Sequence, residues 1–195
     1  MTAYLALLLA VLSRLLPHSF GTTSVGFTAV GGGLLFFGAR QSGGRRWQTA
    51  IAVLAMVATD YYLTTFVYGY PFHISGYVVT WFWYAAVCMI GYQMLRNKQV
   101  EGETKGPSML QVAGAVLASS TSFFVLSNLM VWTGSGMYAH SAAGLATCFI
   151  AAIPFYANDV MSTAVTAGAL FGLPVLARNI AESIRATQND HLPLA

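Results

Sequence analysis

Long stretches of apolar residues, rarely interrupted by charge, constrain this chain more than any other feature. They fall in blocks of about 15 to 25 residues, the length at which an α-helix crosses a hydrocarbon core of ~30 Å. Hydrophobic residues fill 56% of the 195 positions and charged residues only 8%, against roughly 25% in soluble domains. So few charges cannot cover a globular surface. The pattern predicts an all-α integral membrane protein and excludes a disordered chain, a disulfide scaffold and a nucleic-acid-binding module.

Breaks between the apolar blocks divide the chain into six predicted helices. Their approximate ranges are 2–17, 27–40, 47–66, 74–95, 108–133 and 156–180. The first range has no basic residues ahead of it and no cleavage site behind it, so we expect a retained span rather than a signal peptide. We expect residues 1–185 to form a single membrane domain and residues 186–195 to form a cytoplasmic tail.

Two apolar segments are short for a membrane span. One is the second helix, 27–40. The other is segment 140–153, which has 14 residues and stops before Pro154. That length favours a short interfacial or re-entrant helix before the last span.

The basic residues predict how the helices are oriented. Eight of the nine lie in three places that share one side of the membrane if six helices cross it: Arg40, Arg45 and Arg46, then Arg96, Lys98 and Lys105, then Arg178 and Arg185. Connections rich in Lys and Arg face the cytoplasm. We therefore predict a multi-pass protein with both termini and the 96–107 linker in the cytoplasm.

With this orientation, the rare polar residues within the apolar segments gather in the outer half of the membrane. They are Arg14, His18, Asp60, His73, Asn128, His140, Asn158 and Asp159. Ionisable groups inside a membrane are costly unless they are paired or line a wet cavity, so they indicate function. The cluster predicts a ligand pocket open to the outside. A structural alternative stays open, in which Arg14 pairs with Asp60 or Asp159 and the histidines reach to interfacial water.

Aromatic residues surround the same outer region. Most of them fit the ordinary aromatic belt of a membrane interface, but we include Tyr77, Trp132 and Tyr156 in the predicted ligand site. The run from Tyr68 to His73 could act as a lid over a large, flat ligand. Asp60 precedes this run, so we expect its carboxylate to orient the His73 imidazole.

Small residues at four-residue spacing predict close helix contacts. Ala6 and Ala10 form one such pair, Gly168 and Gly172 another, and three consecutive glycines begin at Gly31. Such spacing lets helix backbones touch, either within the fold or against a partner. We expect Cys88 and Cys148, each inside an apolar segment, to be buried free thiols.

Several catalytic signatures are missing from the sequence. It has no phosphate-binding Walker loop, no His-Glu-x-x-His zinc motif and no nucleophile elbow. We therefore expect no enzyme activity and no resident cofactor. Any uphill transport would draw its energy from another subunit.

A set of spaced motifs carries a family resemblance. They are Arg14-Leu-Leu-Pro17-His18, Phe27-Thr28 before a Gly-rich helix, Asp60, Ser127-Asn128-x-x-x-Trp132, and Ile153-Pro154-Phe155-Tyr156-x-Asn158. Over roughly residues 2 to 180 the chain resembles a family of small uncharacterised bacterial membrane proteins. That family looks related to the S-components of energy-coupling factor (ECF) vitamin transporters, nearest to the BtuM-like vitamin B12 S-components.

The resemblance implies a six-helix bundle that binds a vitamin near the outer face of the bacterial inner membrane. It also implies that Ala6 and Ala10 dock on an energising module of the ECF type. His73 stands where the B12 S-components carry a cysteine, so it is a candidate cobalt ligand, with cobalamin as a candidate ligand. Gly26 and Ala29 depart from the Asn-Phe-Thr-Pro that members of the family commonly show.

Three functional hypotheses follow from these features. The first is a substrate-binding membrane subunit for the uptake of a small molecule, such as a vitamin or corrinoid. The second is an accessory or structural subunit of a larger membrane complex, in which the outer polar cluster only holds the helices together. The third is a membrane enzyme using His18, Asp60 and His73, which could hold zinc although their spacing is not diagnostic.

Overall fold

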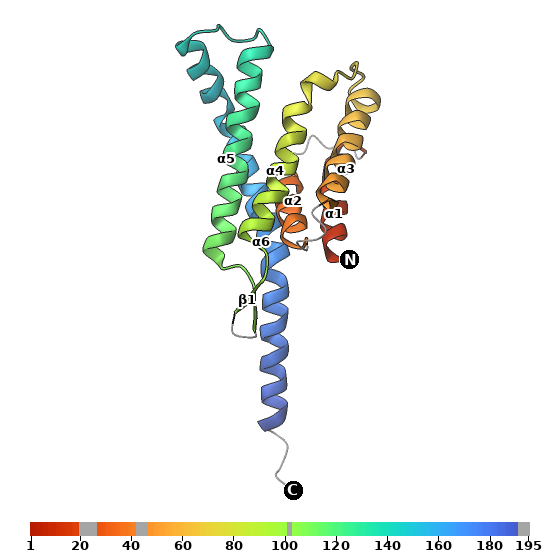
Figure 1. Cartoon of the computed structure of the whole chain (residues 1–195), viewed down its shortest axis with the longest axis vertical. Helices are drawn as coiled ribbons and strands as arrows, with labels where there is room; N and C mark the ends of the chain where they lie inside the picture. The colour runs from red at the N-terminus through yellow and green to blue at the C-terminus, as the bar shows by residue number, and fades with distance from the viewer. Residues whose placement is uncertain (20–26, 42–46, 101–102, 191–195) are drawn as a thin grey trace.

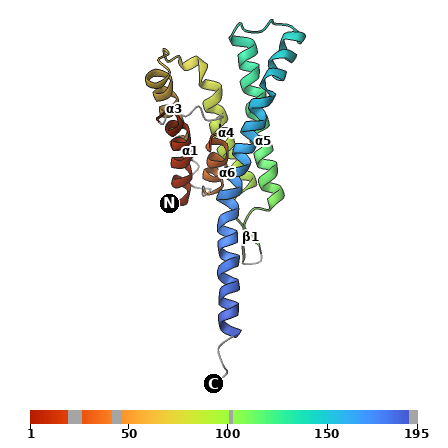
Figure 2. The same ribbon diagram turned by 180° about the vertical axis from the view of Figure 1, so that it is seen from behind.

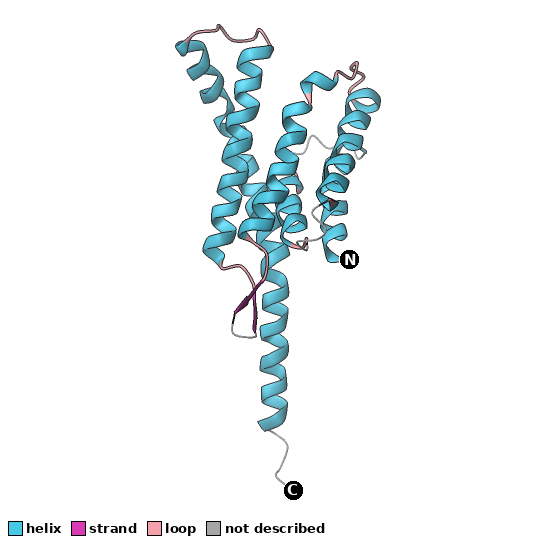
Figure 3. Ribbon diagram, in the orientation of Figure 1, coloured by secondary structure: helices cyan, strands magenta, loops and turns pink. Residues whose placement is uncertain are grey.

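The computed structural model describes residues 1–19, 27–41, 47–100 and 103–190. The described residues form six α-helices, with a π-helical turn at Leu63–Val67 and a 3₁₀ turn at Ile74–Gly76 (Figures 1 and 3). The α-helices are α1 Thr2–Ser19, α2 Val30–Ala39, α3 Gln48–Tyr62, α4 Val78–Met94, α5 Met109–Gly134 and α6 Ala142–Asp190. The predicted all-helical class is thus confirmed, apart from a small hairpin of strands β1 (Lys98–Val100) and β2 (Glu103–Lys105).

The long helices run alternately up and down, which gives the molecule two distinct ends. The N-terminus, the β1–β2 hairpin and the C-terminal part of α6 lie toward one end, which we call the hairpin end (Figures 1 and 2). The connections 68–77 and 135–141 lie at the other, which we call the loop end. The segments predicted to be cytoplasmic therefore lie opposite the connections that carry His73 and His140. Residues 42–46, with Arg45 and Arg46, are outside the described part.

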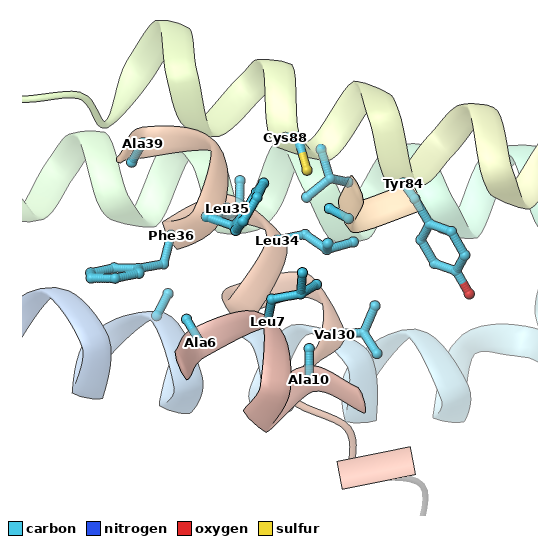
Figure 4. Close-up of a cluster of buried hydrophobic side chains, with 14 of the residues drawn as sticks. Ala6, Leu7, Ala10, Val30, Leu34, Leu35, Phe36, Ala39, Tyr84 and Cys88 are labelled. Carbon is cyan, nitrogen blue, oxygen red and sulfur yellow. The ribbon is translucent and has the colours of Figure 1, made fainter. Parts of the chain in front are cut away.

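The short helix α2 is the centre of the core, and all ten of its residues are buried. It contacts α1, α4 and α6, and its glycines allow these contacts to be close (Figure 4). A Cβ on Gly31 or Gly32 would overlap Thr163 or Thr166 of α6, and one on Gly38 would overlap the Cys88 carbonyl of α4. The Gly-rich helix that we predicted at 27–40 is therefore present as α2, a buried helix of 10 residues that is too short to cross a membrane.

Ala6 and Ala10 pack inside the molecule. Ala6 is 2% exposed and Ala10 is wholly buried. Gly33 lies against them, since a Cβ on Gly33 would come within 3.0 Å of the Ala10 Cβ and the Ala6 carbonyl oxygen. Figure 4 shows both alanines on the side of α1 that faces α2. In this fold they are internal packing residues, and the outer face of α1 carries larger side chains such as Leu5 and Leu9.

Helix α6 corrects one prediction. We expected a separate short helix over 140–153 and a last span starting at 156, but α6 runs unbroken from Ala142 to Asp190 with Pro154 and Pro174 inside it. A proline removes one backbone hydrogen bond, and in apolar surroundings no water would replace the others if the helix broke. The helix also covers residues 186–190 of the predicted tail, while residues 191–195 lie outside the described part.

Three helical segments are long and apolar enough to cross a membrane, judged by length and composition. They are Gln48–Val67, Met109–Gly134 and Ala142–Arg185. Three shorter apolar segments accompany them: Thr2–Leu16, Val30–Ala39 and Val78–Met94. Large apolar side chains also cover much of the exterior, including Leu54, Phe82 and Leu117. An exterior of this kind suits lipid rather than water as the surrounding medium.

Candidate ligand-binding groove

A buried ion pair connects α1 to α3 beside the core. The Arg14 Nη2 atom lies 2.7 Å from the Asp60 Oδ1 atom, and the Asp60 side chain is only 2% exposed. This is one of the two pairings that we predicted as the structural alternative. Losing either partner would leave an unpaired charge in an apolar setting.

Two residues of α4 complete this polar network. The Arg14 Nη1 atom donates a hydrogen bond of 3.2 Å to the Tyr84 hydroxyl, and the Trp81 Nε1 atom donates one of 3.0 Å to Asp60 Oδ2. Both carboxylate oxygens of Asp60 therefore have partners. Asp60 contacts Arg14 and Trp81 rather than His73, which we had predicted as its partner. The His73 side chain is exposed. The network joins α1, α3 and α4 into one unit.

A large cavity lies between α4 and α5. Its volume is about 520 Å³. Ser75 and Gly76 line it at the loop end, and Trp83 of α4 and Phe123 of α5 line it deeper in the bundle. At this end α5 and α6 diverge from α3 and α4 (Figures 1 and 2).

Two smaller cavities adjoin the first, because they share lining residues with it. One of about 280 Å³ is lined by Arg14, Trp83, Phe123 and Asp159, among others. The other, of about 200 Å³, lies between α5 and α6 and is lined by Phe123, Ser127 and Asp159. We call the three cavities together the groove. It runs from the 68–77 connection to Asp159 in the middle of α6.

Buried polar atoms without partners lie at the deep end of the groove. Among the described residues, the Asp159 Oδ2 and Ser120 Oγ atoms are buried and make no hydrogen bond of standard geometry, although the two side chains lie close enough to interact with each other. Both residues line the 200 Å³ cavity. Unpaired buried polar groups are uncommon and cost about 1–3 kcal/mol each. A cavity that contains two of them is therefore suited to a ligand that would pair with them.

The aromatic walls of the groove are fixed by their own contacts. The Trp83 Nε1 atom donates to the Ser119 carbonyl (3.3 Å) and to Ser122 Oγ (3.1 Å), and its ring packs on Phe123 with centroids 4.5 Å apart. The Tyr156 hydroxyl shares a hydrogen bond of 2.9 Å with Thr121. These contacts hold the rings in place before any ligand binds.

The structure divides the predicted ligand residues into two sets. Five of them line the groove: Arg14, Asn128, Tyr156, Asn158 and Asp159. Asp60 contacts Arg14 and does not itself line the groove. The backbone of His18 belongs to α1, and its side chain is outside the described part. The remaining three, His73, Tyr77 and Trp132, lie at the loop end.

At the loop end, Tyr77 and Trp132 stabilise the connections. The Tyr77 hydroxyl shares a hydrogen bond of 2.5 Å with Thr64, and its ring stacks on Phe72 and Trp81. Trp132 donates to the Ala139 carbonyl, and its own carbonyl lies 3.0 Å from the His140 Nε2 atom. Neither residue lines the groove.

Sequence reasoning missed several residues of the groove. Trp83, Phe123 and Ser120 line it, yet none belongs to the predicted ligand site. One signal in the sequence could have identified Ser120. The run Ser119-Ser120-Thr121-Ser122 interrupts an otherwise apolar helix at its middle, where hydroxyl groups need partners.

The described residues contain no group of three or more His, Cys, Asp or Glu side chains placed to hold a metal ion. Cys88 and Cys148 are buried free thiols, as predicted.

Comparison with known proteins gives one family match. The family of unknown function DUF6580 matches residues 1–184. Searches of curated proteins and of solved structures found no match. Because the match covers nearly the whole chain, this protein belongs to the family of unknown function DUF6580.

Proposed function

We propose that this protein is a substrate-binding membrane subunit that takes a small molecule from the outer face of the bacterial inner membrane for uptake. The groove carries the proposal. It is lined at the loop end by Ser75 and Gly76, opposite the β1–β2 hairpin with its lysines, Lys98 and Lys105. Because basic connections face the cytoplasm, the loop end would face outward.

The size and lining of the groove support a compact organic ligand. Ligand pockets typically measure about 300–1,000 Å³ and combine apolar walls with a few polar groups. The main cavity has about 520 Å³, with Trp83 and Phe123 in its walls and Thr80 and Ser127 as hydroxyl groups. Ser120 and Asp159 then supply unpaired polar atoms at the deep end.

The Arg14–Asp60 network supports this function indirectly. It fixes α4 to α1 and α3, and α4 provides one wall of the groove. Because these buried polar contacts already order the wall, less conformational entropy is lost there when a ligand binds.

Cobalamin, the ligand that the family resemblance implies, is larger than the 520 Å³ cavity, so we propose that it would bind across the mouth of the groove rather than inside that cavity. His73 is exposed, two residues before Ser75, which lines the mouth of the groove. Its imidazole would be a suitable ligand for cobalt. Replacement of His73 by Ala should then weaken binding of cobalamin and leave binding of a cobalt-free ligand unchanged.

Uptake against a gradient would require an energising partner, such as a module of the ECF type. Ala6 and Ala10 are buried against Gly33, so we do not place the docking surface there. A partner would instead contact an exposed helix face.

Native mass spectrometry of the gently solubilised protein tests the proposal. We expect a bound small molecule in the parent protein and its loss when Ser127, which lines two of the cavities, is replaced by Trp. Leu117→Trp is the matched control, because Leu117 lies on the same helix and is exposed. A parent protein free of any small molecule, purified from its native membrane, would contradict the proposal.

One observation favours the accessory-subunit alternative. Gly168 and Gly172 of α6 are exposed, and nothing lies within 4 Å of a Cβ built on either. An open pair of glycines at this spacing suits close packing with a helix of another protein. Copurification with stoichiometric large subunits, abolished by Gly168→Leu and without any bound small molecule, would favour this role.

A further inference from the structure

We infer that the groove recognises an organic ammonium group, with Asp159 as its counter-ion and aromatic rings as its walls. This inference rests on the proposed function and adds the chemical class of the ligand. Asp159 lines both smaller cavities, so a ligand in either one would meet it.

The charges around the groove leave one carboxylate unmatched. Arg14 also lines the groove, but its two terminal nitrogens contact Asp60 and Tyr84. Among the side chains that the structure describes, which do not include that of His18, no Lys, Arg or His nitrogen lies within 4.0 Å of the Asp159 carboxylate. Its Oδ2 atom is buried without a partner. The free charge of the site is therefore negative, and the matching ligand group is a cation.

The walls beside Asp159 identify the kind of cation. Four aromatic residues line the same 200 Å³ cavity: Phe123, Phe124, Phe155 and Tyr156. The faces of aromatic rings attract ammonium groups, and such cages are a known way to recognise amines and quaternary ammonium compounds. Metal ions such as Ca²⁺ and Mg²⁺ require a shell of several oxygen ligands, which one carboxylate does not provide.

The neighbouring groups extend this picture to the rest of the ligand. Ser120 places a buried hydroxyl beside Asp159, and Ser127 lies where the small cavity adjoins the main one. An ammonium group at Asp159 would thus place the rest of the molecule along Trp83 and Phe123, in the 520 Å³ cavity. The predicted ligand has a cationic end and an apolar or aromatic body.

Intrinsic tryptophan fluorescence can test the inference, because Trp83 lines the groove. The probes are phenethylammonium and its neutral counterpart 2-phenylethanol, added to the protein in nanodiscs of phosphatidylglycerol. We expect the ammonium probe to bind the parent about tenfold or more tightly than the alcohol, as a charge-assisted contact predicts. Asp159→Asn should remove this preference. Glu182→Gln, the same neutralisation on an exposed part of α6, should retain it.

A second variant keeps the test decisive if Asp159→Asn fails to fold. Phe155 is 74% exposed, so Phe155→Leu should fold normally while it removes one ring of the cage. We expect it to reduce the ammonium preference several-fold, since one aromatic face that attracts the cation is lost. An unchanged preference in this variant would overturn the inference.

Other outcomes separate this inference from the proposed function. Equal binding of both probes to the parent would overturn the ammonium assignment and leave the groove as a binding site for neutral molecules. Binding of neither probe would overturn it as well, and the native mass spectrum would decide separately whether the groove holds another ligand.

The ammonium group could come from a free amine or from a lipid headgroup, and the nanodisc composition distinguishes the two. Adding phosphatidylethanolamine should weaken probe binding if the headgroup is the ligand. Unchanged binding would assign the site to a free organic amine. Both results retain an ammonium ligand at Asp159.

Discussion

The guanidinium of Arg14 in α1 lies 2.7 Å from the carboxylate of Asp60 in the last turn of α3, at a position almost closed to solvent. Trp81 and Tyr84 of α4 bond to the same pair. The contact therefore connects three helices, and its charges balance each other. It accounts, without any ligand, for two of the ionisable groups that we predicted in the outer half of the membrane.

Replacing Asp60 by Asn should reduce stability strongly, because Arg14 would keep its charge without a counter-ion. We expect a loss of about 3–5 kcal/mol, as for other broken buried pairs. The unfolding midpoint in detergent measures it, with Glu182→Gln as the control for the loss of one carboxylate. The double variant Arg14→Leu with Asp60→Leu should lose less than Asp60→Asn. If Asp60→Asn melts like the parent, the pair contributes nothing to the fold.

A second prediction concerns the two small-residue pairs. Ala10→Leu should destabilise the protein by about 1–3 kcal/mol or prevent folding, because the larger side chain would overlap Gly33. Gly168→Leu should fold normally, since space around Gly168 is open. Thermal unfolding of both variants compares them directly. Normal stability of Ala10→Leu would mean that α1 and α2 pack less closely than the approach of Gly33 to Ala10 implies.

These pairs also show what sequence spacing can and cannot predict. The four-residue spacing correctly indicated a close contact for Ala6–Ala10, but the identical spacing of Gly168–Gly172 meets no neighbouring atom in the described part of the chain. Only the fold shows that the first pair faces Gly33 and that the second faces outward. Whether a pair is buried depends on which side of its helix meets α2. Uniformly apolar helices have too weak a hydrophobic periodicity for the sequence to predict that side.

The candidate site was partly predictable for a related reason. Charged residues are rare in apolar segments, so Arg14 and Asp159 were easy to recognise. Their surroundings were not, because Asp60 pairs with Arg14 across 46 positions of sequence, while Asp159 has no cationic partner among the side chains that the structure describes. Trp83 and Phe123 carry no charge and lie in apolar runs, so nothing in the sequence distinguishes them from other aromatic residues, and only their position between α4 and α5 places them in the groove.

The orientation in the membrane can be tested with single cysteines. We expect a cysteine at position 73 to react with a membrane-impermeant reagent from the outer side only, and one at position 98 from the cytoplasmic side only. Cys88 and Cys148 are at most 1% exposed, so they should stay unlabelled in the folded protein. Labelling of position 73 from the cytoplasmic side would reverse the proposed topology and move the mouth of the groove to the inside.

The last prediction concerns Ser120, whose hydroxyl is fully buried, makes no hydrogen bond of standard geometry and lines the cavity beside Asp159. If this hydroxyl serves a ligand, Ser120→Ala should stabilise the ligand-free protein by about 1 kcal/mol and weaken ligand binding. The matched control is Thr59→Val, because the Thr59 hydroxyl donates to the Ala55 carbonyl at 2.7 Å. Its removal should lower the unfolding midpoint and leave binding unchanged.

These opposite shifts can be measured on the same samples by thermal unfolding with and without the phenethylammonium probe. In the parent protein the probe should raise the midpoint, because a ligand that binds only the folded state stabilises it. In Ser120→Ala the midpoint should start higher and rise less. A variant that starts lower than the parent, with an unchanged rise, would show that the hydroxyl has a structural partner. The deep end of the groove would then be part of the core rather than a binding site.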